Sequence, residues 1–395
     1  MSTLEVADIF RRHGADYRHQ HAGHLSLEQL KAMAAIEHCR SASLGGHVLQ
    51  CESCEEQEIS YNSCRNRHCP KCQSMAAKRW LEDRQAELLP VKYFHVVFTL
   101  PAPISGIAYQ NKSVIYALLM RVAAETLITI AADTERLGAR IGVTMVLHTW
   151  GSALTHHPHV HCIVPGGGIS ADGQRWIASR PRFFLSVNVL SERFMYRFLE
   201  ELIKTHARGE LQFFGQYTEL ADLNVFKSWL EPLKDVWWHV YAKPPFARPE
   251  TVLEYLSRYT HRVAIANSRL ISIHNGQVVF KYKDYRKKGG YQKRTMRLAI
   301  DHFIQRFLMH VVPTGFHRIR HYGLWANAHR ADNLTTARDL LNFVLPANND
   351  EVTPQDTATF ICRSCSAPMI IIEIIPPNHQ PRAPPNYHIA RQVSP

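Results

Sequence analysis

Closely spaced cysteines between positions 39 and 72 constrain this chain more than any other feature of its sequence. Two C-x2-C pairs, Cys51 with Cys54 and Cys69 with Cys72, are separated by 14 residues. Each pair places two thiolates on one tight turn, and two such turns supply the four ligands of a tetrahedral zinc ion. The segment has few apolar residues of its own, so a metal would supply its folding energy. The spacing predicts a structural Zn²⁺ ion bound by Cys51, Cys54, Cys69 and Cys72.

Further candidate ligands lie in the same segment. They are Cys39, Cys64, His47 and His68. Either these four bind a second zinc ion, or the cysteines are buried free thiols and the histidines lie at the surface. A late pair, Cys362 and Cys365, offers only two ligands. This pair either borrows ligands from elsewhere in the chain or simply forms a turn.

Length and charge limit the kind of protein that this chain can be. Its 395 residues are enough for two or three domains, and 46% hydrophobic with 20% charged residues is a globular composition. The net charge of +12 favours a polyanionic partner, most often nucleic acid. The first residues lack the apolar core of a secretory signal, and the nine cysteines are an odd number. We therefore expect a cytoplasmic protein whose clustered cysteines bind metal rather than form disulfides.

Segments typical of strands and helices alternate along the chain. Ser26 and Gln29 match a capping box that begins a helix. Apolar runs predict buried strands at 92–101, 141–150 and 159–168. Further strands are expected at 262–268, 276–283 and 317–323, and helices at 78–89, 106–132, 250–259 and 298–311. This alternation predicts an α+β or α/β domain with layers of helices and sheet.

We expect three parts along the sequence. Residues 1–90 form N-terminal helices and a zinc-binding domain, and residues 91–345 form the main domain. Within the latter, residues 170–245 carry no motif for chemistry and are either an insertion or a DNA-contacting subdomain. Residues 346–395 hold nine of the 21 prolines, and the segment after Pro376 cannot sustain a helix or a central strand. We predict a disordered tail there.

Histidines gather around two of the predicted strands. His159 and His161 flank one apolar residue, so on a strand both imidazoles point to the same face and can bind one metal ion. His148 ends the preceding strand, and the segment between has the length of a hairpin. Three neutral imidazoles would leave the metal open to water or a phosphate oxygen. The alternative is a histidine-rich turn without metal.

Two tyrosines lie one helical turn apart in the helix expected at 250–259. Tyr255 and Tyr259 share a helix face, which in isolation is typical of an ordinary core stripe. Beside a metal site the pair predicts nucleophiles: a phenolate can attack a metal-polarised phosphodiester and leave a 5′-phosphotyrosyl link with a free 3′-OH. A cation is needed, because the ordinary tyrosine pKa of about 10 makes the side chain a poor nucleophile.

Basic charge is concentrated in residues 281–320, which hold eleven Lys and Arg residues against two Asp. Aromatic residues interleave this stretch, and cations beside flat rings suit phosphates and stacked bases. The alternative is a solvated basic hairpin and helix. Arg258 and Arg262 could neutralise the charge that develops on a phosphate beside the tyrosines. We expect DNA contacts from Arg258, Arg262, Lys281, Lys283, Arg286, Lys287, Lys288, Lys293, Arg294, Arg318 and Arg320.

These motifs occur together in a characteristic order. In chain order they are CRNRHCPKCQ, HVVFTLP, VLHTWGSALTHHPHVHCIV, YLSRYTHRV and FHRIRHYGL. Together they resemble the motifs of the rolling-circle transposases of the IS91 family, which are HUH endonucleases. The resemblance covers roughly residues 20–345. It implies an α+β protein in which an N-terminal zinc-binding domain precedes a nuclease with a central antiparallel sheet flanked by helices.

The resemblance also implies an activity. Such a transposase cleaves single-stranded DNA at element ends and rejoins it at a target, with Mg²⁺ or Mn²⁺ at the histidines. His159 and His161 match the HUH pair, and His148 resembles the third metal ligand of related relaxases. Tyr255 and Tyr259 match the Y-x3-Y helix of two-tyrosine members. A bacterial, cytoplasmic protein that associates with the nucleoid when bound to DNA is implied.

Three other functions use parts of the same evidence. A plasmid replication initiator or a relaxase would share the chemistry, although the chain has no helicase P-loop. A zinc-dependent DNA-binding regulator would bind DNA without cleaving it. A zinc hydrolase would use the three histidines on a small substrate and would leave the basic stretch unexplained.

Overall fold

The chain divides into two compact units. The computed structural model describes residues 4–73, 87–182, 184–243, 263–284, 292–343, 360–379 and 381. Unit 1 consists of residues 1–73 with 345–395, and unit 2 consists of residues 74–344. The C-terminal segment thus joins the first unit, in place of the separate third part expected from the sequence. The helix expected at 250–259, and most of that expected at 78–89, lie outside the described residues.

Unit 1 contains two helices and a small sheet. The capping box predicted at Ser26 is confirmed, because its hydroxyl accepts the backbone N–H of Gln29 while the Gln29 side chain accepts the N–H of Ser26. An ion pair of 2.6 Å between Arg18 and Glu37 joins the two helices. The elements are α1 (Val6–Gln20), α2 (Leu27–Glu37), the 3-10 helix η1 (Ala42–Leu44), β1 (Gly46–Cys51), β2 (Gln57–Tyr61) and β14 (Met369–Ile375).

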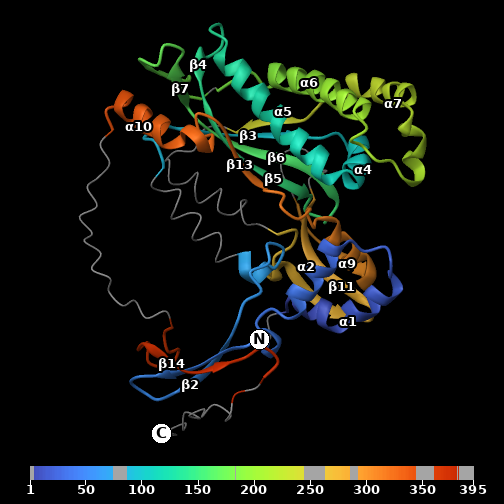
Figure 1. Cartoon of the computed structure of the whole chain (residues 1–395), viewed down its shortest axis with the longest axis vertical. Coiled ribbons are helices and arrows are strands. Elements are labelled where there is room, and N and C mark those ends of the chain that lie inside the picture. Colours follow the sequence, from blue (N-terminus) through green and yellow to red (C-terminus); the bar gives the residue numbers. More distant parts are fainter. Residues whose placement is uncertain are drawn as a thin grey trace. The chain divides into compact units, whose positions relative to one another are not determined.

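The small sheet brings together strands from both ends of the chain. β1 lies in the middle and pairs antiparallel with β2 and with β14 (Figure 1). The prediction of a disordered tail is therefore wrong for residues 369–375. This segment contains no proline and five isoleucines, and β-branched residues favour strands. The proline-rich segment begins after it.

Unit 2 is built on a five-stranded antiparallel sheet in the order β13-β5-β6-β3-β9. The strands predicted near 92–101, 141–150, 159–168 and 317–323 are confirmed, and so is the mixed helix and sheet composition. β6 is the middle strand, so its residues have strand neighbours on both sides. The strands are β3 (Tyr93–Thr99), β5 (Gly142–Trp150), β6 (His156–Pro165), β9 (Val240–Lys243) and β13 (Ile319–Gly323).

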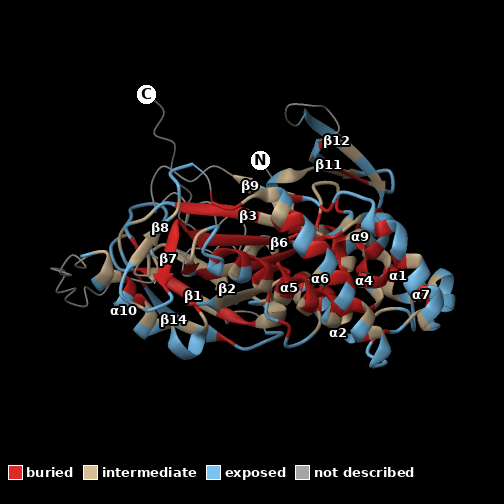
Figure 2. Ribbon diagram, turned by 90° about the horizontal axis from the view of Figure 1, so that it is seen from above, coloured by how far each residue is buried: buried red, intermediate tan, exposed pale blue. Residues whose placement is uncertain are grey.

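Helices cover one face of this sheet: α4 (Ala102–Gln110), α5 (Lys112–Ala132) and α6 (Val187–Ala207). Alternate strand residues such as Val96, Leu147 and Val160 point into this core, which Figure 2 shows as buried along α5 and the central strands. Among the described helices, α5 is long and apolar enough to cross a membrane, with a mean hydropathy of 1.8. Because 67% of that stretch is buried within the protein, α5 is explained as a core helix.

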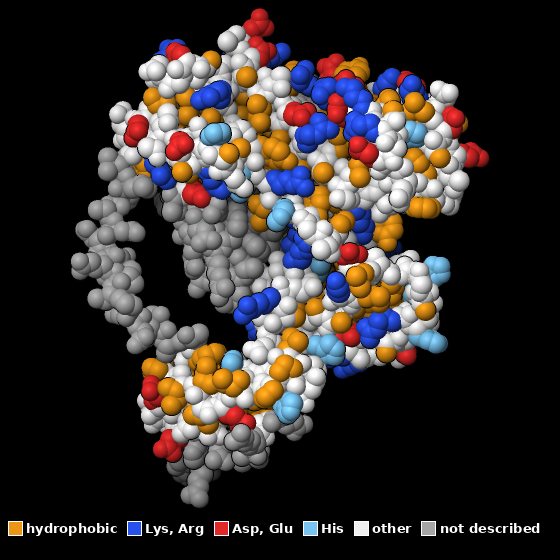
Figure 3. Space-filling model, in the orientation of Figure 1, with side chains coloured by type: hydrophobic (Ala, Val, Ile, Leu, Met, Phe, Trp, Pro, Cys, Tyr) orange, Lys and Arg blue, Asp and Glu red, His pale blue; other side chains and the backbone are white. Residues whose placement is uncertain are grey.

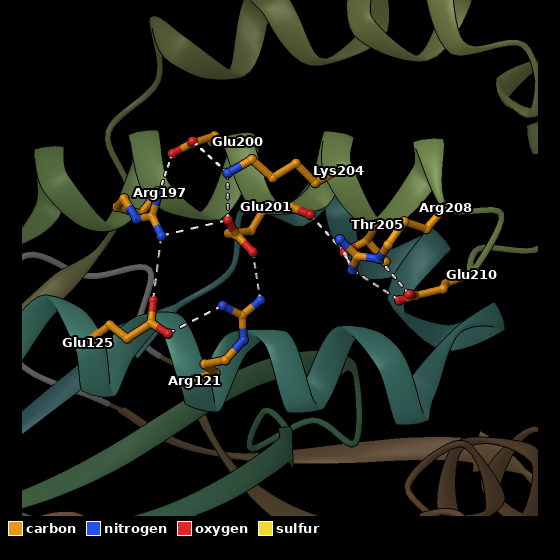
Figure 4. Close-up of polar contacts among 9 residues, drawn as sticks. All are labelled: Arg121, Glu125, Arg197, Glu200, Glu201, Lys204, Thr205, Arg208 and Glu210. Atoms are coloured by element: carbon orange, nitrogen blue, oxygen red, sulfur yellow. Dashed lines mark hydrogen bonds and ion pairs between the residues drawn. The ribbon is translucent and has the colours of Figure 1, made fainter.

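An ion-pair network joins α5 to α6 (Figure 4). Glu201 of α6 accepts hydrogen bonds from Arg121 of α5 at 2.9 Å and from Lys204 at 3.0 Å. Arg197 reaches Glu201 at 3.6 Å and Glu125 of α5 at 3.7 Å. In the space-filling view, basic and acidic side chains alternate over the part of unit 2 seen above α5 (Figure 3). The network adds polar contacts to the apolar packing of the two helices.

A second antiparallel sheet contains the basic stretch. β10 (Leu270–His274), β11 (Gln277–Asp284) and β12 (Gln292–Ala299) precede α9 (Ile300–Met309), and Phe280 of β11 packs edge-on against Phe303 of α9 at 5.8 Å. The strand predicted at 276–283 and the helix predicted at 298–311 are confirmed. The strand predicted at 262–268 is wrong for its described part, which ends in the 3-10 helix η4 (Asn267–Arg269). The short apolar run there is buried without pairing in a sheet.

Residues 170–245 belong to the same architecture rather than to a separate insertion. They supply α6 to the helical layer and β9 to the main sheet. Trp238 is buried and its indole N–H donates to the carbonyl of Leu233 at 2.9 Å. The remaining elements of unit 2 are β4 (Ala139–Arg140), β7 (Gly167–Ser170), β8 (Trp176–Ala178), η2 (Gly215–Ala221), α7 (Leu223–Leu230), η3 (Glu231–Lys234), η5 (Asn327–His329) and α10 (Arg330–Leu340).

Candidate functional site

Three histidines meet on the face of the main sheet that the helices leave open. His148 on β5 lies directly opposite His159 on β6, and His161 follows two residues later on the same strand. The core residues Leu147 and Val160 point the other way, which is the alternation that the sequence predicted. One nitrogen of each imidazole lies within 4.8 Å of the others. The structure thus brings the predicted trio together in a geometry that can hold a metal ion.

Burial keeps the imidazoles of His159 and His161 neutral. It lowers the pKa of His159 to about 4 and holds the pKa of His161 well below its ordinary value, with neighbouring His148 and His159 adding to the second effect. The ring of Trp150 stacks on His148 at 4.7 Å. Because the neutral imidazole is the form that binds metals, the site offers its nitrogen lone pairs at neutral pH.

A fourth histidine, missed by sequence reasoning, contacts this trio. His95 on β3 places its Nε2 2.7 Å from Nδ1 of His161, with the two rings nearly parallel. Burial, assisted by the charge of Lys243, lowers the pKa of His95 to about 3, so its Nε2 can accept the Nδ1–H of His161. The Nε2 of His161 is then the ligand atom, an arrangement common around metal-binding histidines. His95 could have been noticed as the polar residue between Phe94 and Val96 in an apolar strand.

The histidines line a cavity of about 890 Å³. Lys243 of β9, Arg269 of η4 and Lys283 of β11 contribute cationic side chains to its wall, and Tyr241 and Tyr282 contribute aromatic rings. Cations and aromatic rings around one cavity suit the phosphates and bases of a nucleic acid strand. Lys243 and Arg269 were not predicted. Both lie outside residues 281–320 in the sequence, and only the folded arrangement of the strands brings their side chains to the cavity.

The predicted basic contacts are placed in different ways. Lys281, Lys283, Lys293 and Arg294 are exposed on β11 and β12, and Lys283 lies directly opposite Lys293. Like charges at facing positions repel each other. An anion bound beside this hairpin would reduce that repulsion. Of these four, Lys283 alone lines the cavity.

Two further predicted contacts, on or beside β13, lie away from the cavity. Arg318 is buried, and Arg320 packs over the ring of Phe316 at 4.9 Å. Other predicted residues lie outside the described part of the chain. They are Tyr255, Arg258, Tyr259, Arg262, Arg286, Lys287 and Lys288.

The cysteines of unit 1 group differently from the prediction. One set is Cys39, Cys64, Cys69 and Cys72, and the other is Cys51, Cys54, Cys362 and Cys365. The predicted grouping of Cys51 and Cys54 with Cys69 and Cys72 is therefore wrong. The physical reason is β14, whose pairing with β1 brings the late C-x2-C pair beside the first one. His47 and His68 belong to neither set.

Each set of thiols is compact enough to hold one metal ion. In the first set, Cys39 Sγ lies 3.6 Å from the sulfur of Cys69 and 3.6 Å from that of Cys72. A disulfide would need about 2.05 Å, whereas sulfurs bound to zinc at about 2.3 Å lie about 3.8 Å apart at the corners of a tetrahedron. In the second set, Sγ of Cys51 lies 3.4 Å from that of Cys365, and Sγ of Cys54 lies 3.6 Å from that of Cys362. Both sets therefore suit a thiolate-bound structural metal.

Comparison with known proteins gives consistent matches. Residues 142–333 match the family described as "Putative transposase", and residues 9–100 match the "Transposase zinc-binding domain". The chain is 56% identical over 352 residues to "Putative transposase y4qJ" of Sinorhizobium fredii (strain NBRC 101917 / NGR234), covering 89% of this chain and 88% of that protein. It is 28% identical over 360 residues to "Transposase for insertion sequence element IS801" of Pseudomonas savastanoi pv. phaseolicola, covering 88% and 83%. No solved structure matches the chain.

Proposed function

Since this chain belongs to the IS91 family of transposases, we propose that it cleaves and rejoins single-stranded DNA through a 5′-phosphotyrosine intermediate during rolling-circle transposition. The observation that carries the proposal is the cluster of His148, His159 and His161 on one wall of a cationic cavity. In this proposal the five-stranded sheet of unit 2 is the core of an HUH nuclease. The protein acts in the cytoplasm, on the nucleoid.

The histidines would bind the catalytic divalent ion. Their neutral nitrogens are held on neighbouring strands of one sheet, and the ion they hold would polarise the scissile phosphate. Three nitrogen donors favour Mn²⁺ over Mg²⁺, because Mg²⁺ prefers oxygen ligands more strongly. His95 keeps His161 oriented toward the ion through the 2.7 Å hydrogen bond.

The cavity wall would hold the DNA strand. Lys243, Arg269 and Lys283 neutralise phosphates, and the exposed ring of Tyr241 offers a surface on which a base can stack. Phosphate contacts fix the register of a strand without reading its sequence. Recognition of the element end is then shared with unit 1, whose structural zinc would order its cysteine-rich segment.

Tyr255 and Tyr259 would be the nucleophiles. The oxygen of one phenolate attacks the phosphorus, the bond from phosphorus to the 3′ oxygen breaks, and that oxygen leaves as a 3′-OH after taking up a proton. The phosphotyrosine ester conserves the bond energy, so a 3′-OH can later displace the tyrosine and rejoin the strand without ATP. Two tyrosines allow a second cleavage before the first strand is released.

A covalent adduct assay tests this proposal. The protein is incubated with single-stranded end DNA and either Mg²⁺ or Mn²⁺, then denatured and resolved by electrophoresis. We expect a protein–DNA adduct that is lost when Tyr255→Phe and Tyr259→Phe are combined. The single variants show how much of the adduct each tyrosine forms. Tyr196→Phe, at an exposed position on α6, is the matched control and should leave the adduct unchanged.

The same assay separates the alternatives. DNA binding without an adduct under either metal would contradict the proposal and support a non-catalytic regulator. Adduct formation that persists in His159→Ala would contradict the role given to the metal. A replication initiator or relaxase would also form the adduct, and mobilisation of a marked element in cells distinguishes a transposase from both.

A further inference from the structure

Cys362 and Cys365 lie far beyond residues 9–100, which match the transposase zinc-binding domain. We propose that these two cysteines complete a second structural zinc site with Cys51 and Cys54, so that one Zn²⁺ ion joins the C-terminal segment of unit 1 to its N-terminal segment. This inference does not depend on the proposed nuclease mechanism, because it concerns only the thiols and folding of unit 1.

The first pair of ligands lies on a tight turn between β1 and β2. The backbone N–H of Cys51 donates to the carbonyl of Glu56 at 2.9 Å, and the N–H of Glu55 donates to the carbonyl of Cys51 at 3.2 Å. Glu55, directly after Cys54, has a left-handed backbone with φ of 58°. A residue other than glycine rarely adopts this conformation, so the turn has a defined geometry and is not an irregular loop.

The second pair lies on a turn of the same construction. The N–H of Cys362 donates to the carbonyl of Ala367 at 2.9 Å, and the N–H of Ser366 donates to the carbonyl of Cys362 at 3.0 Å. Ser366 directly follows Cys365 and again has a left-handed backbone, with φ of 61°. Two C-x2-C turns with the same hydrogen bonds and the same strained position therefore come from segments more than 300 residues apart.

The two turns face each other with their sulfurs converging. Sγ of Cys365 lies 3.4 Å from that of Cys51 and 3.5 Å from that of Cys54, and Sγ of Cys362 lies 3.6 Å from that of Cys54. All four sulfurs lie within 4.8 Å of one another. The three shortest separations are slightly below the roughly 3.8 Å expected between thiolates around one zinc ion. They are too long for disulfides.

The surroundings explain why a metal is needed there. The pairing of β1 with β14 ends at Cys51 opposite Met369, and the local apolar cluster is formed mainly by Leu49, Met369 and two of the cysteines themselves. So small a core cannot offset the ordering of two chain segments. A zinc ion bound by four thiolates supplies that free energy. One consequence is that this site can be completed only after unit 2 has been synthesised.

Zinc content of the full chain tests the proposal. Every protein in this test carries His159→Ala, so that the histidine cluster does not contribute to the zinc count. Each is purified under reducing conditions and analysed by native mass spectrometry and by a colorimetric zinc assay after denaturation. We expect two zinc ions in the chain with all its cysteines and one in the double variant Cys362→Ser with Cys365→Ser. Ser364→Ala changes an exposed residue between the two cysteines and is the matched control, which should keep both ions.

A second variant distinguishes loss of a metal ligand from loss of folding. Cys365→His keeps a ligand that binds zinc, and Cys365 is exposed, so there is room for the larger ring. With Co²⁺ replacing zinc, this variant should keep two metal ions while the ligand-field absorption of the second ion moves toward that of a three-sulfur, one-nitrogen site. Two zinc ions retained in the double serine variant, or an absorption spectrum unchanged by Cys365→His, would overturn the proposal.

Discussion

His95 and His161 illustrate how much of this site depends on strand register. The spacing of His159 and His161 alone predicted that both rings share a face, because alternate residues on a strand point the same way. His95 could not be paired with them from sequence, because no pattern in the chain says that β3 lies beside β6 with Val97 opposite His161. A one-residue slip would point His95 into the helical core instead. Local periodicity therefore predicted the ligands, and only the fold revealed the residue that orients one of them.

Replacing His95 tests its positioning role. We expect His95→Leu to weaken Mn²⁺ binding about 10- to 100-fold, because the hydrogen bond that fixes the tautomer and angle of His161 is lost. His95→Gln should recover part of the affinity, since its side-chain oxygen can accept the same N–H. Binding is measured by calorimetry or by the electron paramagnetic resonance signal of free Mn²⁺.

A histidine away from the cluster provides the control for this prediction. His274 on β10 is exposed and does not line the cavity. His274→Gln should therefore change the Mn²⁺ affinity by less than about 2-fold. Equal affinities in wild type and His95→Leu would show that His161 is held without its partner.

Helices and strands were predictable where their signals are local. The capping box at Ser26 and the apolar runs of β3, β5 and β6 specify their elements within a few residues. Pairing between distant segments was not predictable: the late C-x2-C pair offered two ligands with no indication of where the others lie. β14 was obscured by the prolines that follow it. The arrangement of cysteines depends on one long-range strand pairing, and this explains why the grouping from sequence spacing was wrong.

The contact between α5 and α6 gives a prediction about helix packing. Arg121 and Lys204 lower the pKa of Glu201, and this carboxylate is only 9% exposed. We expect Glu201→Gln to lower the free energy of unfolding of unit 2 by about 1–2 kcal/mol at pH 7, because the charged partners lose their acceptor. Glu200→Gln changes an exposed ion pair and should lower the free energy of unfolding much less, because solvent screens exposed pairs. Urea denaturation followed by circular dichroism measures both.

The pH dependence of this difference follows from the sign of the pKa shift. A carboxyl whose pKa is lowered by folding stabilises the protein above its ordinary pKa of 4.5. That contribution is lost as the pH falls toward the lowered value. The difference in free energy of unfolding between the wild type and Glu201→Gln should therefore be constant from pH 8 to about 5.5 and shrink below about 4.5. A gap that widens in acid would contradict the ion-pair explanation.

The two units are stabilised by different means. Unit 2 has a large apolar core between its main sheet and its helices, and its site residues are carried by strands of that sheet. In unit 1, by contrast, the three-stranded sheet is closed at one end by converging thiols. Burial of apolar surface stabilises a large core such as that of unit 2 without any ligand. A small sheet closed by thiols, as in unit 1, gains its free energy of folding from bound metal. The loss of metal should therefore affect the two units unequally.

Zinc chelation tests this difference within one molecule. After excess of a strong zinc chelator, we expect the backbone amides of β1, β2 and β14 to exchange with deuterium at least about 100-fold faster, equivalent to about 2.7 kcal/mol of lost protection. Amides of β5 and β6 should exchange at unchanged rates, because the core of unit 2 does not depend on the thiols. Hydrogen exchange followed by mass spectrometry resolves both sets of strands, and re-adding Zn²⁺ should restore protection. Undiminished protection of β14 in verified zinc-free protein would show that its pairing with β1 holds without the metal.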